Sequence, residues 1–161
     1  MTDATFSDCG RYRYVLRRIW DGGPLMCFVM LNPSTADATR DDATIRICIG
    51  RAKRMGYGGI AVVNLFALRS TDPSLLYSEN NPISEASPRD YKNNLFINQF
   101  ARSADIVICA WGKHGALLDR GTIVLQHLRD LGVQPYALRL NKDGSPAHPL
   151  RIGYDQQPFP F

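Results

Sequence analysis

The sequence has few cysteines and histidines, and none of them stand in the spacing of a metal site. The cysteines Cys9, Cys27, Cys48 and Cys109 are far apart, with no C-x-x-C pair, and the three histidines are scattered. This pattern argues against a zinc centre and against a disulfide framework. Three of the cysteines fall inside apolar segments, where a thiol behaves as a small hydrophobe. We therefore expect reduced core cysteines, no metal and no cofactor.

Long apolar runs and internal repeats are also missing. No stretch approaches the roughly 20 apolar residues that a membrane-spanning helix needs, and Met1–Gly10 are polar, unlike a secretory signal. We expect a cytoplasmic protein with no membrane partner. The 161 residues are 45% hydrophobic and 21% charged, with no Gly/Ser-rich linker, so they predict a single α/β domain over residues 1–161. The net charge of +4 permits a phosphate-bearing partner without requiring one.

Two strands are predicted near the N-terminus. Arg11–Trp20 alternates aromatic or aliphatic residues with basic ones, which is the period-2 pattern of a half-exposed strand. Leu25–Leu31 is continuously apolar, as expected for a strand that is covered on both faces. A turn at Asp21–Pro24 separates them. These features predict an antiparallel hairpin whose first strand lies at the edge of a sheet.

Helices and strands alternate along the rest of the chain. The residue patterns predict strands over Ile60–Phe66, Asp105–Trp111 and Gln134–Leu140, and helices over Thr44–Met55, from Ser87 to about Arg102, and from about Gly115 to Leu131. Ser87-Pro88-Arg89-Asp90 is a strong helix start. Strands that alternate with helices imply parallel crossovers. We therefore predict an α/β fold: a three-layer α/β/α sandwich with a mainly parallel central sheet of about four strands and an antiparallel N-terminal edge strand.

Polar side chains gather just past the ends of the predicted strands. In open parallel sheets, ligands bind beyond the carboxyl ends of the strands, where the strand order reverses. Amides, hydroxyls, acids, one indole and two imidazoles are expected to meet at this rim. The candidate catalytic residues are Asn32, Asp37 and His148, and the candidate ligand-binding residues are Ser34, Thr35, Asn64, Phe66, Trp111 and Lys113.

Most of these residues also have a purely structural interpretation. Asn32-Pro33 is a common turn, Asn64 could bond to the backbone within a turn, and Trp111 could be a core residue. The aspartates Asp37, Asp41 and Asp42 could bind a divalent cation through oxygen. We favour helix capping for them, because an acid is stabilised at the positive end of a helix. Among the histidines, the loop residue His148 is the best candidate for acid–base or hydrogen-bonding work, whereas His127 lies within a helix, where we expect no chemistry.

Five segments together resemble the uncharacterised bacterial and phage family called domain of unknown function 1643. The resemblance covers roughly Arg11–Ile152 and rests on MLNPSTAD, DDATIRIC, GYGGIAVVNLFALRSTDP, CAWG and HPL. The family carries no established activity, so this resemblance implies membership rather than a reaction.

The layout is similar, at greater distance, to the uracil-DNA glycosylase superfamily. That superfamily has a small α/β/α sandwich with a four-stranded parallel sheet and short motifs after its strands. By this resemblance, Asn32 would position the attacking water, Asn64 would read a base edge, and His148 would donate a hydrogen bond to the departing base. The sequence departs from the pattern at Leu31 and Ser34, where a glycine is usual beside the Asn-Pro pair, and in reading H-P-L in place of H-P-S-P.

Three hypotheses about function follow. The first is a protein directed at a nucleobase or nucleotide, most concretely an N-glycosidic hydrolase, with the base stacked on Phe66 or Trp111. The second is a non-catalytic module in which the same rim binds a nucleotide or nucleic acid. The third is a metal-assisted phosphoesterase that uses Asp37, Asp41 and Asp42. The expected partner is a nucleobase, a nucleotide or DNA.

Overall fold

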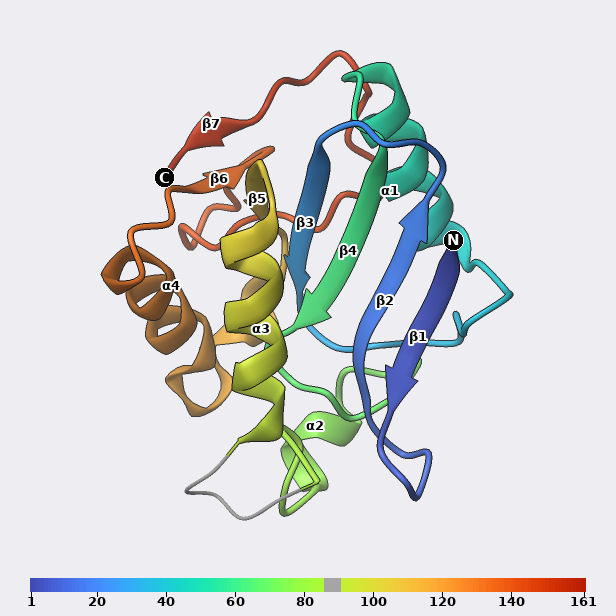
Figure 1. Ribbon diagram of the computed structural model, residues 1–161. Helices are drawn as coiled ribbons and strands as arrows, with labels where there is room; N and C mark the ends of the chain where they lie inside the picture. The colour runs from blue at the N-terminus through green and yellow to red at the C-terminus, as the bar shows by residue number, and fades with distance from the viewer. Residues whose placement is uncertain (86–90) are drawn as a thin grey trace.

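The fold is built on one mixed sheet, seen face-on in Figure 1. The computed structural model describes residues 1–85 and 91–161, so the predicted helix start at 87–90 lies outside the described residues. Within the described part, seven strands are ordered β1-β2-β4-β3-β5-β6-β7. The strands are β1 (Thr2–Phe6), β2 (Arg13–Ile19), β3 (Leu25–Met30), β4 (Gly59–Asn64), β5 (Ile106–Cys109), β6 (Pro135–Ala137) and β7 (Phe159–Pro160). The helices are α1 (Ala43–Arg54), α2 (Leu75–Ser78), α3 (Lys92–Ser103), the 3₁₀ helix Lys113–Asp119 and α4 (Arg120–Asp130).

Four neighbouring strands at the centre of the sheet, β4, β3, β5 and β6, run parallel. The sequences of β3 and β4, LMCFVM and GIAVVN, are apolar almost throughout and are buried, as parallel strands covered on both faces should be. The chain passes from β3 to β4 on one side and then returns to place β5 on the other side of β3. The strand order therefore reverses beside β3, which is where a parallel sheet opens a crevice at its carboxyl ends.

The helices bury their apolar residues in two separate clusters. Ile45, Cys48 and Ala52 of α1 pack with β-strand side chains that include Met26 and Phe28. On the other side, Ile97 and Phe100 of α3 and Val124 and Leu128 of α4 join a second cluster with Val29 and Val63. The predicted helix over Gly115–Leu131 is in fact broken, because Leu118 and Asp119 have positive φ angles of 53° and 55°. A left-handed backbone at two successive residues cannot continue an α-helix.

The predicted hairpin is wrong, and the strand predicted at the edge is antiparallel as expected but lies one position inside the edge. β2 pairs with β4 rather than with β3, and β1 covers its other side. The loop Asp21–Pro24 wraps around Gly58, whose N–H donates to Pro24 O at 2.8 Å while its carbonyl accepts from Trp20 and Asp21. A Cβ at Gly58 would overlap Gly23, so the close approach needs glycine at both positions. The loop crosses the end of β4 at this contact, since β4 lies between β2 and β3 in the sheet.

The sheet is also larger and more antiparallel than predicted. Of the six pairings between the described strands, three are parallel and three are antiparallel. Two antiparallel pairings hold β1 and β2 at one end, and the third adds β7 at the other. The mixed α/β class is therefore confirmed, with a four-stranded parallel centre inside a seven-stranded sheet.

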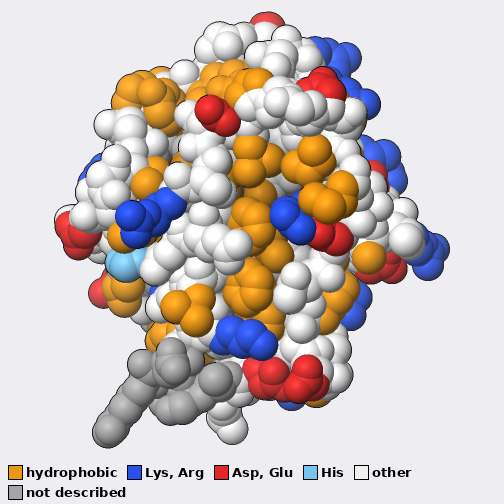
Figure 2. All heavy atoms as spheres, viewed as in Figure 1, with side chains coloured by type: hydrophobic (Ala, Val, Ile, Leu, Met, Phe, Trp, Pro, Cys, Tyr) orange, Lys and Arg blue, Asp and Glu red, His pale blue; other side chains and the backbone are white. Residues whose placement is uncertain are grey.

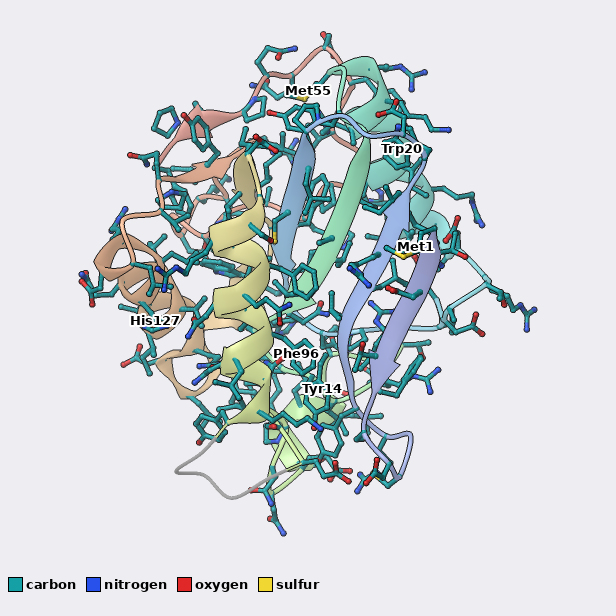
Figure 3. The ribbon with its side chains drawn as sticks, in the orientation of Figure 1. Met1, Tyr14, Trp20, Met55, Phe96 and His127 are labelled. Atoms are coloured by element: carbon teal, nitrogen blue, oxygen red, sulfur yellow. The ribbon has the colours of Figure 1, made fainter. Side chains whose placement is uncertain are left out.

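Aromatic side chains join α3 to the antiparallel end of the sheet. Phe96 stacks on Tyr14 of β2 with ring centroids 5.2 Å apart and planes 7° apart, as labelled in Figure 3. Figure 2 shows hydrophobic side chains gathered along the band between α3 and β2. On the outer side, His127 of α4 lies 2.6 Å from Asn98 Oδ1 of α3 through its Nε2 atom. His127 therefore has a helix-bridging contact far from the strand ends.

Three of the four cysteines are core residues, as expected. Cys27, Cys48 and Cys109 are buried free thiols, and Cys9 is an exposed one. Burial raises the pKa of the Cys27 thiol to about 12, so this group stays protonated and unreactive. Among residues 1–85 and 91–161, no helix has the length and apolar character needed to cross a bilayer.

Candidate functional site

The loop from Leu31 to Asp42 connects β3 to α1 and is hydrogen-bonded to two buried arginines of β2. Arg13 donates from Nη1 to Ala36 O at 2.7 Å, and Arg18 donates from Nη2 to Asp37 O at 2.6 Å. Arg18 also binds Asp41 Oδ1 through Nε at 2.8 Å. These contacts hold the loop in one conformation before any ligand arrives.

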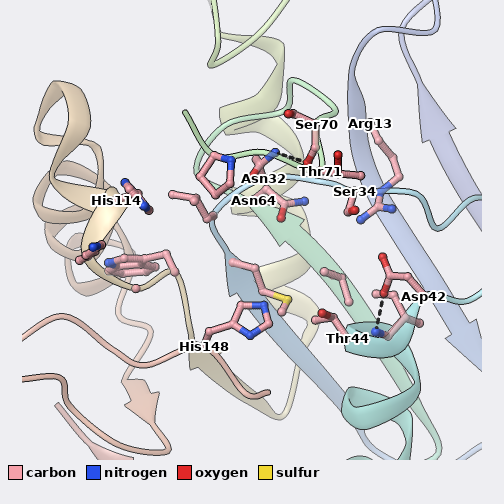
Figure 4. Close-up of a pocket in the computed structure, with 18 residues that line it drawn as sticks. Arg13, Asn32, Ser34, Asp42, Thr44, Asn64, Ser70, Thr71, His114 and His148 are labelled. Carbon is pink, nitrogen blue, oxygen red and sulfur yellow. Dashed lines mark hydrogen bonds between the residues drawn. The ribbon is translucent and has the colours of Figure 1, made fainter. Parts of the chain in front are cut away.

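A cavity of about 340 Å³ opens at the carboxyl ends of β3, β4 and β5 (Figure 4). Its position is the reversal of strand order beside β3, where ligands of open parallel sheets bind. Its size lies at the lower end of the range for small-molecule sites. The lining residues are Arg13, Met30, Leu31, Asn32, Ser34, Asp42, Thr44, Ile45, Val62, Asn64, Ser70, Thr71, Pro73, Trp111, Gly112, Lys113, His114 and His148.

Asn32 stands where β3 ends, and its amide is held by the facing loop. Its Nδ2 donates to Ser70 O at 3.0 Å and, less closely, to Leu68 O at 3.3 Å, and Figure 4 shows the contact with Ser70. The nitrogen end of the amide is thus engaged with backbone. The oxygen end, Oδ1, is left to accept a hydrogen bond from a molecule in the cavity.

Asn64 is the last residue of β4 and is only 1% exposed. Its Nδ2 is buried and makes no hydrogen bond within the described part of the chain. A buried donor without a partner costs about 1–3 kcal/mol, and such groups call for an explanation. Because Asn64 lines the cavity, a ligand acceptor placed there would satisfy it.

His148 comes from the loop after β6 and reaches the same cavity. Its Nδ1 accepts from the Leu150 N–H at 3.2 Å, so the neutral ring carries its proton on Nε2. His148 is an exposed residue, but the protein beside its ring removes part of its water shell and lowers the pKa of His148 below its ordinary value, an effect that the negative charge of Asp42 opposes. The ring is therefore neutral at pH 7 and has an Nε2–H donor available.

Asp42 is the one carboxylate among the described residues that lines the cavity. It caps α1, because its Oδ1 accepts from the Ile45 N–H at 2.9 Å. Capping was the expected role for this residue, and its place in the cavity adds a second one. A carboxylate at the N-terminus of a helix can accept a proton or stabilise a positive charge that develops on a ligand.

Trp111 forms the aromatic wall of the cavity and is 5% exposed. A Cβ added at Gly115 or at Gly121 would overlap or crowd the indole ring. On the same wall, His114 Nδ1 lies 2.9 Å from the hydroxyl of Tyr77. The two glycines therefore let the chain close tightly around Trp111 and fix the plane of its ring.

We predict that Gly115→Ala lowers the free energy of unfolding by about 1–3 kcal/mol, because overpacking a rigid aromatic ring forces it or the backbone to move. Chemical denaturation measures this loss. The matched control is Gly22→Ala, since nothing lies within 4 Å of a Cβ at Gly22 and its φ is not positive. Equal stabilities of the two variants would contradict the assigned packing of Trp111.

Six of the nine residues predicted from the sequence line this one cavity. They are Asn32, Ser34, Asn64, Trp111, Lys113 and His148. They come from the ends of β3, β4 and β5 and from the loop after β6. The expectation that strand-end residues meet at one rim holds for this set.

The other three predicted residues lie elsewhere. Phe66 is fully buried in the core cluster that includes Val29 and Val63, and its N–H donates to Leu31 O. Its ring is not available to stack on a base, and Trp111 is the aromatic side chain that remains. Thr35 is exposed in a shallow hollow beside Arg40. Asp37 is outside the cavity lining, and the backbone N–H groups of Thr39 and Arg40 bind its carboxylate and lower its pKa.

The three aspartates proposed for a metal each have a different partner. Asp37 binds backbone N–H groups, Asp41 binds Arg18, and Asp42 caps α1. Within residues 1–85 and 91–161, no three His, Cys, Asp or Glu side chains are grouped as metal ligands. The geometry therefore lends no support to a phosphoesterase built on these aspartates.

The cavity also contains residues that the sequence did not single out for it. Thr44, Ser70, Thr71 and Arg13 line it. Arg13 departs most from the prediction. It is only 2% exposed, although the alternating pattern of its strand predicted a basic side chain that faces solvent. Its neighbours Tyr12 and Tyr14 are buried as well, which the alternating pattern of the sequence did not indicate.

The comparison with family models gives one match. Residues 13–150 match the family described as "Protein of unknown function (DUF1643)". The chain belongs to this family. The match spans β2 through the loop that carries His148, so every cavity residue of this DUF1643 protein lies within the family region. Searches of curated proteins and of solved structures returned no match.

Proposed function

We propose that this protein hydrolyses the N-glycosidic bond of a nucleobase-containing substrate. The observation that carries the proposal is that Asn32 and Asn64, at the ends of β3 and β4, and His148, in the loop after β6, line one cavity. These are the residues whose roles the distant resemblance to uracil-DNA glycosylases implies. The four parallel strands, with α1 in one core cluster and α3 and α4 in the other, suit the sandwich of that superfamily.

The donors of the cavity suit the departing base. Cleavage of an N-glycosidic bond builds negative charge on the base, and donors already aimed at that charge lower the barrier. His148 offers Nε2–H, since Leu150 occupies Nδ1. Asn64 offers an Nδ2 that lacks a partner in the described structure. Trp111 supplies a flat face against which the base can stack.

The acceptors of the cavity suit the attacking water and the sugar. Asn32 has Oδ1 free because its Nδ2 binds Ser70 O, so it can orient a water molecule. The carboxylate of Asp42 can stabilise the positive charge that develops on the sugar. In this proposal Asp42 takes the catalytic place that the sequence pattern gave to Asp37. A cytoplasmic location, which suits buried free thiols, goes with the proposal.

The test is release of free base, measured by liquid chromatography, from a panel of nucleosides, mononucleotides and base-modified DNA. The informative variant is Asn64→Leu, which removes an unsatisfied buried amide and keeps a similar volume. We expect it to stop base release while keeping or raising the free energy of unfolding by up to about 1 kcal/mol, because the buried Nδ2 of Asn64 has no hydrogen bond to lose among the described residues.

The matched control is Asn93→Leu. Asn93 is also a buried asparagine, but its Nδ2 donates to Asn64 O at 2.8 Å and to Leu65 O at 3.2 Å, and it does not line the cavity. We expect this variant to lose stability by about 1–3 kcal/mol and to keep its rate of base release per folded molecule. Absence of base release by the wild type across the whole panel would contradict the proposed hydrolase activity. Binding without release would leave a nucleotide-binding module.

A further inference from the structure

One end of the cavity contains a buried cation without a carboxylate partner. Arg13 makes one hydrogen bond, from Nη1 to Ala36 O, and its Nε is buried without a partner in the described structure. The three ion pairs among the described residues involve Arg11, Arg17 and Arg18, so no carboxylate oxygen of the described residues lies within 4.0 Å of the Arg13 guanidinium. The charges of Asp42 and Asp37 act on Arg13 from a greater distance. A buried charge in this state is costly unless something pairs with it.

The other buried arginines differ from Arg13 in their surroundings. Arg18 is paired with Asp41. Arg51 donates to the carbonyls of Gln156, Ile152 and Gly153, and it lies away from the cavity. Arg120 is buried as well and donates to Leu65 O and Asn94 Oδ1. Arg51 Nε, like Arg13 Nε, has no partner in the described structure. Of these four buried arginines, Arg13 is the one that lines the cavity. Burial lowers the pKa of Arg13 to about 10, so the guanidinium keeps its charge at neutral pH.

The charges around the cavity favour an anion. Arg13 and Lys113 are two cations against the single carboxylate of Asp42, and Asp42 has one oxygen turned to the Ile45 N–H. Figure 4 shows Arg13 and Ser34 on the side of the cavity opposite His114. The site therefore has a charged, hydroxyl-bearing side around Arg13 and an aromatic wall at Trp111.

We propose that Arg13 binds a phosphate group of the ligand, so that the cavity takes a nucleotide in preference to a nucleoside or a free base. The inference rests on the proposed function for the base-binding part of the site. A guanidinium presents its donors in a planar fork that matches phosphate oxygens, and Nε is one arm of that fork. The phosphate can belong to a free mononucleotide or to a nucleic-acid strand.

Isothermal titration calorimetry at low salt tests this with uridine, cytidine, adenosine and guanosine, their 5′-monophosphates, inorganic phosphate and a short single-stranded oligonucleotide. For the wild type, we expect at least one monophosphate or the oligonucleotide to bind about tenfold or more tightly than the matching nucleoside, which corresponds to about 1.4 kcal/mol. Inorganic phosphate should compete. Tight binding of the monophosphate identifies a free nucleotide as the source, and tight binding of the oligonucleotide alone identifies a strand.

The decisive variant is Arg13→Met, which we expect to bring nucleotide and nucleoside affinities to within about twofold of each other, since a charge-assisted bond to phosphate is lost. Arg51→Met is the matched control, because it removes a buried arginine outside the cavity and should keep the nucleotide preference. Thermal melts verify folding. If Arg13→Met does not fold, Arg13→Lys keeps the charge without the fork and should still weaken the preference.

Equal wild-type affinities for nucleotide and nucleoside would overturn the proposal. So would an unchanged preference for nucleotide in Arg13→Met. If Lys113→Met then lost that preference, the phosphate would be assigned to Lys113. These outcomes are separate from the fate of the hydrolase. A phosphate-dependent affinity without base release supports phosphate binding by Arg13 and contradicts the proposed hydrolase activity. Equal release of base from nucleosides and nucleotides, with no difference in affinity, keeps the hydrolase and removes the Arg13 site.

Discussion

Replacing His148 with alanine is expected to slow base release by about 10²–10³-fold, the usual loss when one donor to a developing anion is removed. The donor is Nε2–H, since Nδ1 is occupied by the Leu150 N–H. The effect should fall on kcat more than on KM, because the interaction strengthens as the bond breaks. Steady-state kinetics on whichever substrate of the panel releases base measures it.

Two variants frame this result. His148→Gln retains an N–H donor and should recover part of the rate. His127→Ala, a helix-bridging histidine remote from the cavity, should be as active as the wild type. Protonation of His148 requires its Nδ1 to give up the Leu150 bond, and the pKa of the ring is lowered. The wild-type rate should therefore hold at neutral pH and decline on the acid side only below the ordinary histidine range. Full activity of His148→Ala would refute the assigned role.

The second large effect is expected from Asp42→Asn, which should slow base release by about 10²–10⁴-fold, the range found for a positioned acid or base. Asparagine and aspartate are equally good at the N-cap, so the bond to the Ile45 N–H and the stability of α1 should survive. The loss would then report the charge of Asp42 alone. Kinetics and thermal melts on the same preparation separate the two readouts.

Asp37→Asn is the comparison that decides between the two carboxylates. Asp37 lies outside the cavity lining and binds the N–H groups of its own loop, so its amide variant should keep the wild-type rate. A slow Asp37→Asn together with a normal Asp42→Asn would restore the assignment made from the sequence pattern and contradict the geometry.

The parallel centre of the fold was predictable from the sequence, whereas the edges were not. Strands β3, β4 and β5 are continuous apolar runs, and such runs are read directly as buried strands. β1 escaped prediction because its residues, TDATF, are largely polar and only partly buried. The pairing of β2 with β4 is accompanied by the close approach of Gly23 and Gly58, which are far apart in the sequence. Local patterns contain no information about such a contact.

The site divides in a similar way. That Asn32, Asn64 and His148 line one cavity was predictable, because each ends a strand or lies in the segment after one, and topology brings strand ends together. The burial of Arg13 was not predictable, because a basic side chain in an alternating strand normally faces water. Only tertiary packing shows that Arg13 is buried, at 2% exposure. The sequence placed Phe66 at the strand-end rim, but its ring packs in the core cluster, and the position of a ring relative to a core depends on tertiary packing.

The most direct test of the central claim is an NMR titration of ¹⁵N-labelled protein with the four 5′-monophosphates. The buried Nδ2 of Asn64 has no partner in the described structure, so its side-chain amide signals should move when a ligand acceptor reaches it. We expect those signals to shift together with the backbone amides of Asn32, Gly112 and His148. Saturating ligand that shifts other regions of the protein and leaves Asn64 unmoved would show that the cavity is not the binding site.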